Sequence, residues 1–155
     1  MRRALIGMVA LALAGCSVGA DIPVAQAGVK VVHADYNGGK CAAIRDKAAP
    51  EFQGSTSAET WKRVCDQFIA GLGKFISGNQ VGWNDQYNNG DHIITLNFES
   101  TFEKGKATEQ FLFRIAGGGA VLVGYHVNSP VFDVVPAIAP TPSPGATPPA
   151  APKPK

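Results

Sequence analysis

Residues 56–73 read TSAETWKRVCDQFIAGLG and carry the clearest helical pattern in the chain. A hydroxyl at Thr56 followed three positions later by Glu59 fits a capping box, which predicts that a helix begins here. Gly73 is suited to end that helix as its C-terminal cap. Apolar side chains recur between these points at i, i+3, i+4, i+7, i+8 and i+11, and they are Trp61, Val64, Cys65, Phe68, Ile69 and Leu72. This stripe predicts an amphipathic helix with one face on a core.

After Gly73 the apolar period changes from about 3.6 residues to 2, which indicates β-strands. Turn-forming residues at 88–91, 104–106 and 117–119 separate four such segments. The residues expected to share one face are Val81, Trp83, Asp85 and Tyr87, then Ile94, Leu96, Phe98 and Phe102, then Phe111, Phe113 and Ile115, and residues 121–127 form the last strand. Short turns at this spacing predict an antiparallel meander with one face in water. Glycines 117–119 lie between strands, which argues against a phosphate-binding loop.

Two weaker helical patterns precede the capped helix. The first has Val24, Ala27, Val31 and Ala34 near helical spacing, and the second has Cys41, Ile44, Ala48 and Phe52 on one side, with Pro50 expected to end or kink it. Helices followed by hairpins are an α+β plan, with N-terminal helices packed on a four-stranded antiparallel sheet. Cys41 and Cys65 lie in the apolar stripes of two helices, so both should face the common core. A disulfide between them is predicted, and two buried free thiols are the alternative.

The N-terminus resembles a bacterial lipoprotein signal. Arg2 and Arg3 precede an apolar run at residues 4–13, which is too short to span a bilayer, and Leu13-Ala14-Gly15-Cys16 fits a lipobox. The resemblance implies removal of residues 1–15 and diacylglyceryl attachment at Cys16, which would anchor the chain to a membrane. Ser17 favours the outer membrane, facing the periplasm, in a Gram-negative host. The alternative is a plain secreted protein.

Charge balance and proline content characterise the rest of the chain. Without Arg2 and Arg3, 12 basic side chains (14 − 2) balance 12 acidic ones, which gives no argument for nucleic-acid binding. Residues 16–23 are expected to be a lipidated tether and residues 24–135 a single domain. Eight of the 11 prolines fall in residues 136–155, which predicts a disordered proline-rich tail.

Several short motifs in this order resemble the bacterial domain of unknown function 4019 family of secreted proteins and lipoproteins. They are Asp35-Tyr36, residues 48–52 (AAPEF), Ser57 with Trp61, Leu72-Gly73, residues 98–102 (FESTF), Glu109 and Gly124-Tyr125. The resemblance covers about residues 29–127 and implies a cystatin-like fold, related to that of nuclear transport factor 2, with a curved sheet. It implies no activity and no catalytic residues. Many relatives have tryptophan at the position of Ala120, so a larger cavity or a repacked one is expected there.

Candidate site residues are few. The histidines His33, His92 and His126 lack carboxylate or cysteine neighbours at ligand spacing in the sequence, so no metal site and no cofactor is predicted. Glu109 shares its strand face with Phe111 and Phe113, and a sheet-rim position is favoured over a pocket position in which its pKa would be raised. The side chains that would line a concave pocket are Trp83, Tyr87, Phe98, Glu109, Phe113 and Tyr125, and the alternative is that the aromatic ones are core.

Three functions follow from these patterns. The leading prediction is a non-enzymatic envelope lipoprotein whose domain is an interaction or accessory module, with the bilayer and an envelope protein or the cell wall as partners. The second is a small-ligand-binding protein that uses the concave face of the sheet. The third is a pocket enzyme in which Tyr125 acts with Asp85 or Glu109. An open cavity with convergent polar groups would favour the second or third, and a filled core would favour the first.

Overall fold

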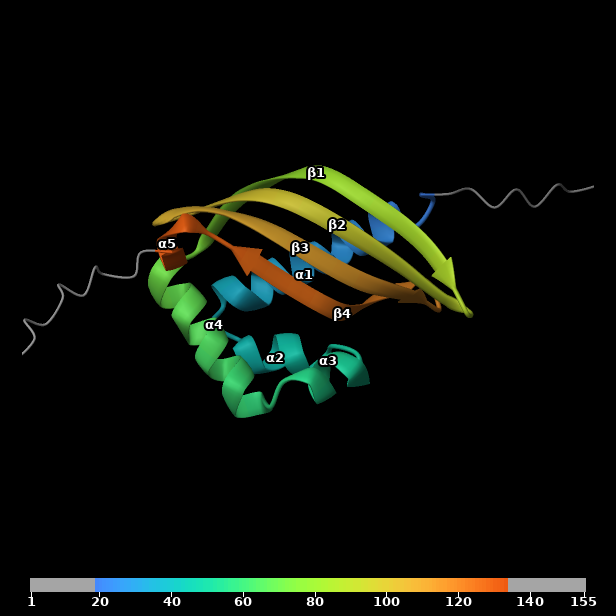
Figure 1. Cartoon of the computed structure of the whole chain (residues 1–155), viewed down its shortest axis with the longest axis horizontal. Helices are drawn as coiled ribbons and strands as arrows, with labels where there is room; N and C mark the ends of the chain where they lie inside the picture. Colours follow the sequence, from blue (N-terminus) through green and yellow to red (C-terminus); the bar gives the residue numbers. More distant parts are fainter. Residues whose placement is uncertain (1–18, 134–155) are drawn as a thin grey trace, which may run out of the picture.

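The computed structural model describes residues 19–133, in which five helices and one four-stranded sheet form in the predicted order (Figure 1). The helices are α1 (Ile22–Asn37), α2 (Cys41–Asp46), α3 (Pro50–Ser55), α4 (Ala58–Leu72) and α5 (Pro130–Asp133). The strands are β1 (Phe75–Asn88), β2 (Asp91–Phe102), β3 (Gly105–Ala116) and β4 (Gly119–Asn128). Each strand pairs antiparallel with the next, in the order β1-β2-β3-β4. The predicted α+β meander is therefore confirmed, and the sheet curves around α1.

Tight turns set the register of two of the hairpins. Asn89 and Gly90 have positive φ angles of 50° and 91°, and Gly117 and Gly118 have 57° and 75°. These values suit the two-residue hairpin loops that follow the natural twist of the strands. The resulting pairs, such as Leu96 opposite Phe111, place the predicted apolar residues of β2 and β3 on one face.

Helix α4 begins one residue later than the capping-box pattern predicts. Ser57 is the N-cap, and its Oγ accepts a hydrogen bond from the Thr60 amide at 3.1 Å. Glu59 therefore stands at the second helical position and does not make the reciprocal bond of a capping box. The C-terminal prediction is confirmed, because Gly73 has a φ of 74° and its amide donates to the Ile69 carbonyl.

The predicted buried face of α1 is wrong. Val31, Ala27 and Ala34 are exposed, and the helix instead buries Ala25, Val29, Val32, His33, Asp35 and Tyr36. The true face includes two polar aromatic residues, which the apolar pattern did not count. Gly28 lets this face approach the sheet closely, since a Cβ built there would lie 2.7 Å from the Phe113 ring.

Pro50 does not end a long second helix but begins a separate one. Helix α2 ends at Asp46, Ala49 has extended backbone, and Pro50 occupies the first turn of α3. Proline suits this position because the first amides of a helix have no intrahelical partner. The predicted apolar residues Cys41, Ile44, Ala48 and Phe52 are all buried.

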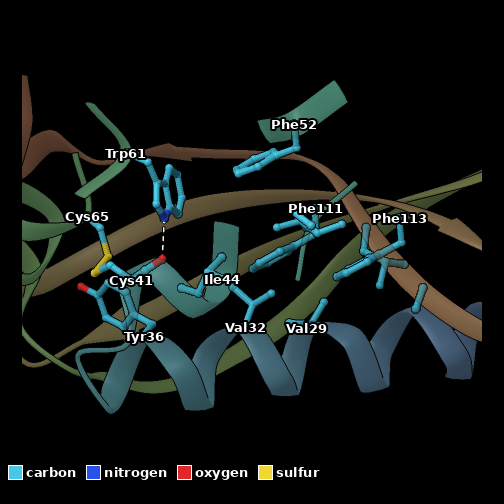
Figure 2. Close-up of a cluster of buried hydrophobic side chains, with 14 of the residues drawn as sticks. Val29, Val32, Tyr36, Cys41, Ile44, Phe52, Trp61, Cys65, Phe111 and Phe113 are labelled. Atoms are coloured by element: carbon cyan, nitrogen blue, oxygen red, sulfur yellow. Dashed lines mark hydrogen bonds between the residues drawn. A yellow bond between two sulfur atoms is a disulfide. The ribbon is translucent and has the colours of Figure 1, made fainter. Parts of the chain in front are cut away.

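The core is centred where α1, α2 and α4 meet the concave face of the sheet (Figure 2). Cys41 and Cys65 lie at disulfide distance, with their Cα atoms 6.0 Å apart, as predicted. Trp61 donates its indole N–H to the Cys41 carbonyl at 2.7 Å and meets the Phe52 ring edge to face. This cluster joins α2, α3 and α4 into one layer.

After β4, part of the apolar run packs back on the domain, as expected. Phe132 of α5 packs against Phe68 of α4, and Val131 contacts the core. The predicted signal peptide 1–15, the lipidated Cys16, Val134, Val135 and the proline-rich tail 136–155 lie outside the described residues. None of the helices within residues 19–133 is long and apolar enough to cross a membrane.

Candidate functional site

The main polar cluster inside the domain surrounds the carboxylate of Glu109. This side chain is on β3, is only 1 % exposed, and points from the sheet towards α1. His33 of α1 has its Nε2 3.0 Å from Oε2, Tyr125 of β4 donates to Oε1 at 2.5 Å, and Ser100 of β2 also donates to Oε2. The expectation that Glu109 lies at the sheet rim is therefore wrong. Its three partners come from three different elements and make burial of the carboxylate possible.

The environment of Glu109 favours the charged carboxylate. Burial by itself raises the pKa of Glu109, but the hydrogen bond and charge of His33, with the hydrogen bonds from Ser100 and Tyr125, outweigh burial and lower this pKa. The direction of this shift is opposite to the raised pKa expected for a pocket position of Glu109. The pKa of Tyr125 is raised well above its usual value by burial and by the neighbouring negative charge of Glu109.

The cluster does not have the geometry of a nucleophilic triad. In such a triad the hydroxyl binds one nitrogen of the histidine and the carboxylate binds the other. Here the hydroxyls of Ser100 and Tyr125 both donate to Glu109, so neither is paired with His33. Tyr125 is thus joined to Glu109 and not to Asp85, and the arrangement fixes α1 against β2, β3 and β4.

A groove of about 490 Å³ lies between α1 and β1, next to this cluster. Its walls are the side of α1 and the edge of the sheet, and the lining residues are Gln26, Val29, Lys30, His33, Phe75, Ser77, Gly78, Gln80 and Phe98. Gln26 donates to Gln80 at 2.7 Å and bridges the helix and the strand. The His33 ring stacks on Phe75 with their centroids 3.6 Å apart.

One nitrogen of His33 is available to this groove. Nδ1 makes no hydrogen bond to any residue that the structure describes. Every fully buried side-chain N or O atom in this part of the chain has a hydrogen-bond partner, so Nδ1 is not fully buried. Nδ1 therefore borders solvent, and the groove is the solvent-filled space that His33 lines. A hollow of about 560 Å³ on the outer face of the sheet includes neither His33 nor Glu109.

A second buried carboxylate lies where the described chain begins. Asp85 of β1 accepts a hydrogen bond from the Gly19 amide at 2.7 Å and lies 2.7 Å from Nε2 of His92. Nδ1 of His92 is 3.6 Å from Asp21. Two of the three histidines therefore have carboxylate partners that sequence spacing did not reveal, while His126 is exposed on β4. Residues 19–133 hold no group of three or more His, Cys, Asp or Glu side chains that could bind a metal ion.

The six predicted pocket residues do not line one cavity. Phe113 and Glu109 are buried in the core, and Tyr125 is half-buried and stacks on Phe111. Phe98 is also half-buried and lines the groove between α1 and β1. Trp83 and Tyr87 are exposed on β1. The sequence patterns did not predict the other polar residues of the cluster and the groove, which are Gln26, Lys30, His33, Ser77, Gln80 and Ser100.

No protein-family model matches the chain, and comparisons with curated proteins and with solved structures also find no match. The resemblance to the domain of unknown function 4019 family stays a prediction.

Proposed function

We propose that this chain is a lipid-anchored protein of the bacterial envelope whose domain is a non-catalytic interaction or accessory module. The observation that carries the proposal is the closed cluster around Glu109. The carboxylate, the serine and the tyrosine that a pocket enzyme would need are bonded to one another, and Glu109 is sealed from solvent. Because the Glu109 carboxylate is buried and shared by donors from three elements, a structural role in holding α1 to the sheet fits it best.

Two further features support an envelope location. The lipobox at residues 13–16 precedes the first described residue, Gly19, by only three positions, so a lipid on Cys16 would hold the domain directly at a membrane. Cys41 and Cys65 lie at disulfide distance, which fits an oxidising compartment such as the periplasm. An outer-membrane anchor that faces the periplasm is the form this proposal takes in a Gram-negative host.

Partition of the protein into detergent tests the anchor. We expect wild-type protein to enter the detergent phase of a cloud-point separation, and the Cys16→Ser variant to stay uncleaved or to enter the aqueous phase. Wild-type protein in the aqueous phase, without acyl mass, would contradict lipid anchoring.

The groove between α1 and β1 favours small-ligand binding as a second candidate function. It combines the aromatic walls of Phe75 and Phe98 with Nδ1 of His33 and the ammonium group of Lys30. These groups suit a small organic anion with a flat apolar body, because the ring faces would contact the body and Lys30 would attract the charge.

Amide chemical-shift perturbation with benzoate and indole acetate as probes tests this candidate. Shifts should concentrate at residues 26–33 and 75–80, and the Lys30→Glu variant should weaken binding several-fold. Lys40→Glu is the matched control, since Lys40 is also an exposed lysine but does not line the groove. Equal weakening by both variants, or shifts elsewhere, would count against a site in this groove.

A further inference from the structure

The chain enters the described fold between two exposed aromatic side chains of β1. The Gly19 amide donates to Asp85, whose side chain is only 3 % exposed, and His92 holds the other carboxylate oxygen. Because side chains alternate along a strand, Trp83 and Tyr87 share a face with Asp85 and stand on either side of it. A hydrogen bond therefore joins the first described residue to the strand between these two rings.

Both aromatic side chains are unusually accessible for their size. Trp83 is 48 % exposed and Tyr87 is 71 % exposed, although Tyr87 also stacks on His92. The Trp83 ring lies beside Gly19, 3.6 Å from where a Cβ would be. Tryptophan and tyrosine favour membrane interfaces, where one end of the side chain is in apolar surroundings and the other is hydrated.

The length of chain outside the structure brings this patch to a membrane. Two residues lie between Cys16 and Gly19, so three Cα-to-Cα steps join them and their Cα atoms are at most about 11 Å apart even when the chain is fully extended. The headgroup layer on each side of a bilayer is about 5–8 Å deep. If Cys16 carries its lipid at that layer, Gly19 lies in it or directly above it.

We propose that Trp83 and Tyr87 lie in the headgroup region of the bilayer that holds the Cys16 lipid, and that they orient the domain on it. This inference rests on the proposed lipid anchor. The partner is the lipid surface itself, and the contact is aromatic and not electrostatic. The charged groups near the patch are carboxylates with partners: Asp85 lies between the two rings and contacts His92, Asp21 lies 3.6 Å from Nδ1 of His92, and Asp91 pairs with Arg114.

The orientation has a consequence for the other end of the chain. Helix α5 lies at the end of the sheet away from the start of α1, so the last described residues lie on the side of the domain opposite the proposed membrane contact (Figure 1).

Tryptophan fluorescence of the full mature lipoprotein in vesicles tests the proposal. The vesicles are phosphatidylcholine, with or without bromine near the top of the acyl chains, because bromine quenches indole only at close range. We expect wild-type emission to fall in brominated vesicles and the fall to disappear in Trp83→Phe. The remaining Trp61 is buried in the core and reports an intact fold.

The Ile76→Trp change in the Trp83→Phe background is the matched control. Ile76 is 61 % exposed on the same strand, about 23 Å along β1 from Trp83, so emission from this position should stay within about a tenth of its value in unbrominated vesicles.

Each other outcome overturns the inference. Protein that floats with vesicles while wild-type emission is unchanged would refute membrane docking and leave the lipid anchor standing. Protein that does not float with vesicles would refute both. Equal quenching at positions 76 and 83 would refute the orientation. An emission change that depends on the protein-to-lipid ratio, and is the same with and without brominated lipid, would show that a second copy of the chain covers the patch.

Discussion

Replacing Glu109 with leucine removes the acceptor shared by three donors inside the domain. The side chain of leucine fills a similar space, but His33, Ser100 and Tyr125 would then face a group that accepts no hydrogen bond. An orphaned buried donor costs about 1–3 kcal/mol. Because three donors lose their acceptor, we expect Glu109→Leu to lower the free energy of unfolding by about 3 kcal/mol or more.

Urea unfolding, followed by far-ultraviolet circular dichroism, measures this loss. Glu99→Leu is the control, because Glu99 is an exposed glutamate on β2 and its replacement should change stability by no more than about 0.5 kcal/mol. Glu109→Gln keeps the shape and one acceptor, so its effect should be intermediate. If Glu109→Leu were as mild as Glu99→Leu, the cluster would not hold α1 to the sheet.

The same experiment has a defined pH dependence. The pKa of Glu109 is lowered in the folded state, because the His33, Ser100 and Tyr125 interactions outweigh burial. A lowered folded pKa contributes stability that is present above the unfolded value of about 4.3 and is lost as the pH falls through the folded pKa. The stability difference between wild type and Glu109→Leu should therefore be full at pH 7 and shrink below about pH 4. A difference that grew in acid would contradict this assignment.

Other regions give independent predictions. Replacing Cys41 and Cys65 together by alanine should lower stability by about 3.5 kcal/mol for a loop with a sequence separation of 24, and alkylation of native protein before reduction should label neither cysteine. Burial and the charges of Glu109 and Glu103 raise the pKa of Tyr36 to about 12. Stability should therefore be lost as the pH rises from about 10 through that value. Alkaline unfolding of Tyr36→Phe should show that this loss is removed. A chain that ends at Val135 should have a Tm within a few degrees of the full mature protein, and a fall of about 10 °C would mean that the proline-rich tail docks on the fold.

The features of the fold that the sequence predicts correctly are those whose cause lies within one short segment of the chain. The stripe from Trp61 to Leu72 and the change of period after Gly73 are each contained in one short segment. The face of α1 could not be predicted in this way. His33 and Tyr36 are buried because their polar atoms reach Glu109 and the Gly73 carbonyl, 76 and 37 residues away. Without these partners both residues would be expected to face water.

The candidate site shows the same limit. The alternation of side chains in β3 places Glu109 on the same face as Phe111 and Phe113. The sequence shows no partner for a buried carboxylate, so the pattern favours the rim of the sheet. Its partners come from β2, β4 and α1, and no local pattern joins them. The contact between Asp85 and His92 could be predicted from the sequence. The Asn89-Gly90 turn sets Tyr87 opposite His92 and so brings Asp85 close to the same ring.

The measurement that tests the central claim most directly is the intact mass of the protein extracted from bacterial membranes, with fragmentation of its N-terminus. We predict a chain that begins at Cys16, carries a diacylglyceryl group on the sulfur, and loses two further mass units relative to the reduced form because Cys41 and Cys65 are joined. A chain with an unmodified Cys16 thiol would contradict the lipid anchor, and with it the membrane-docked orientation of the domain.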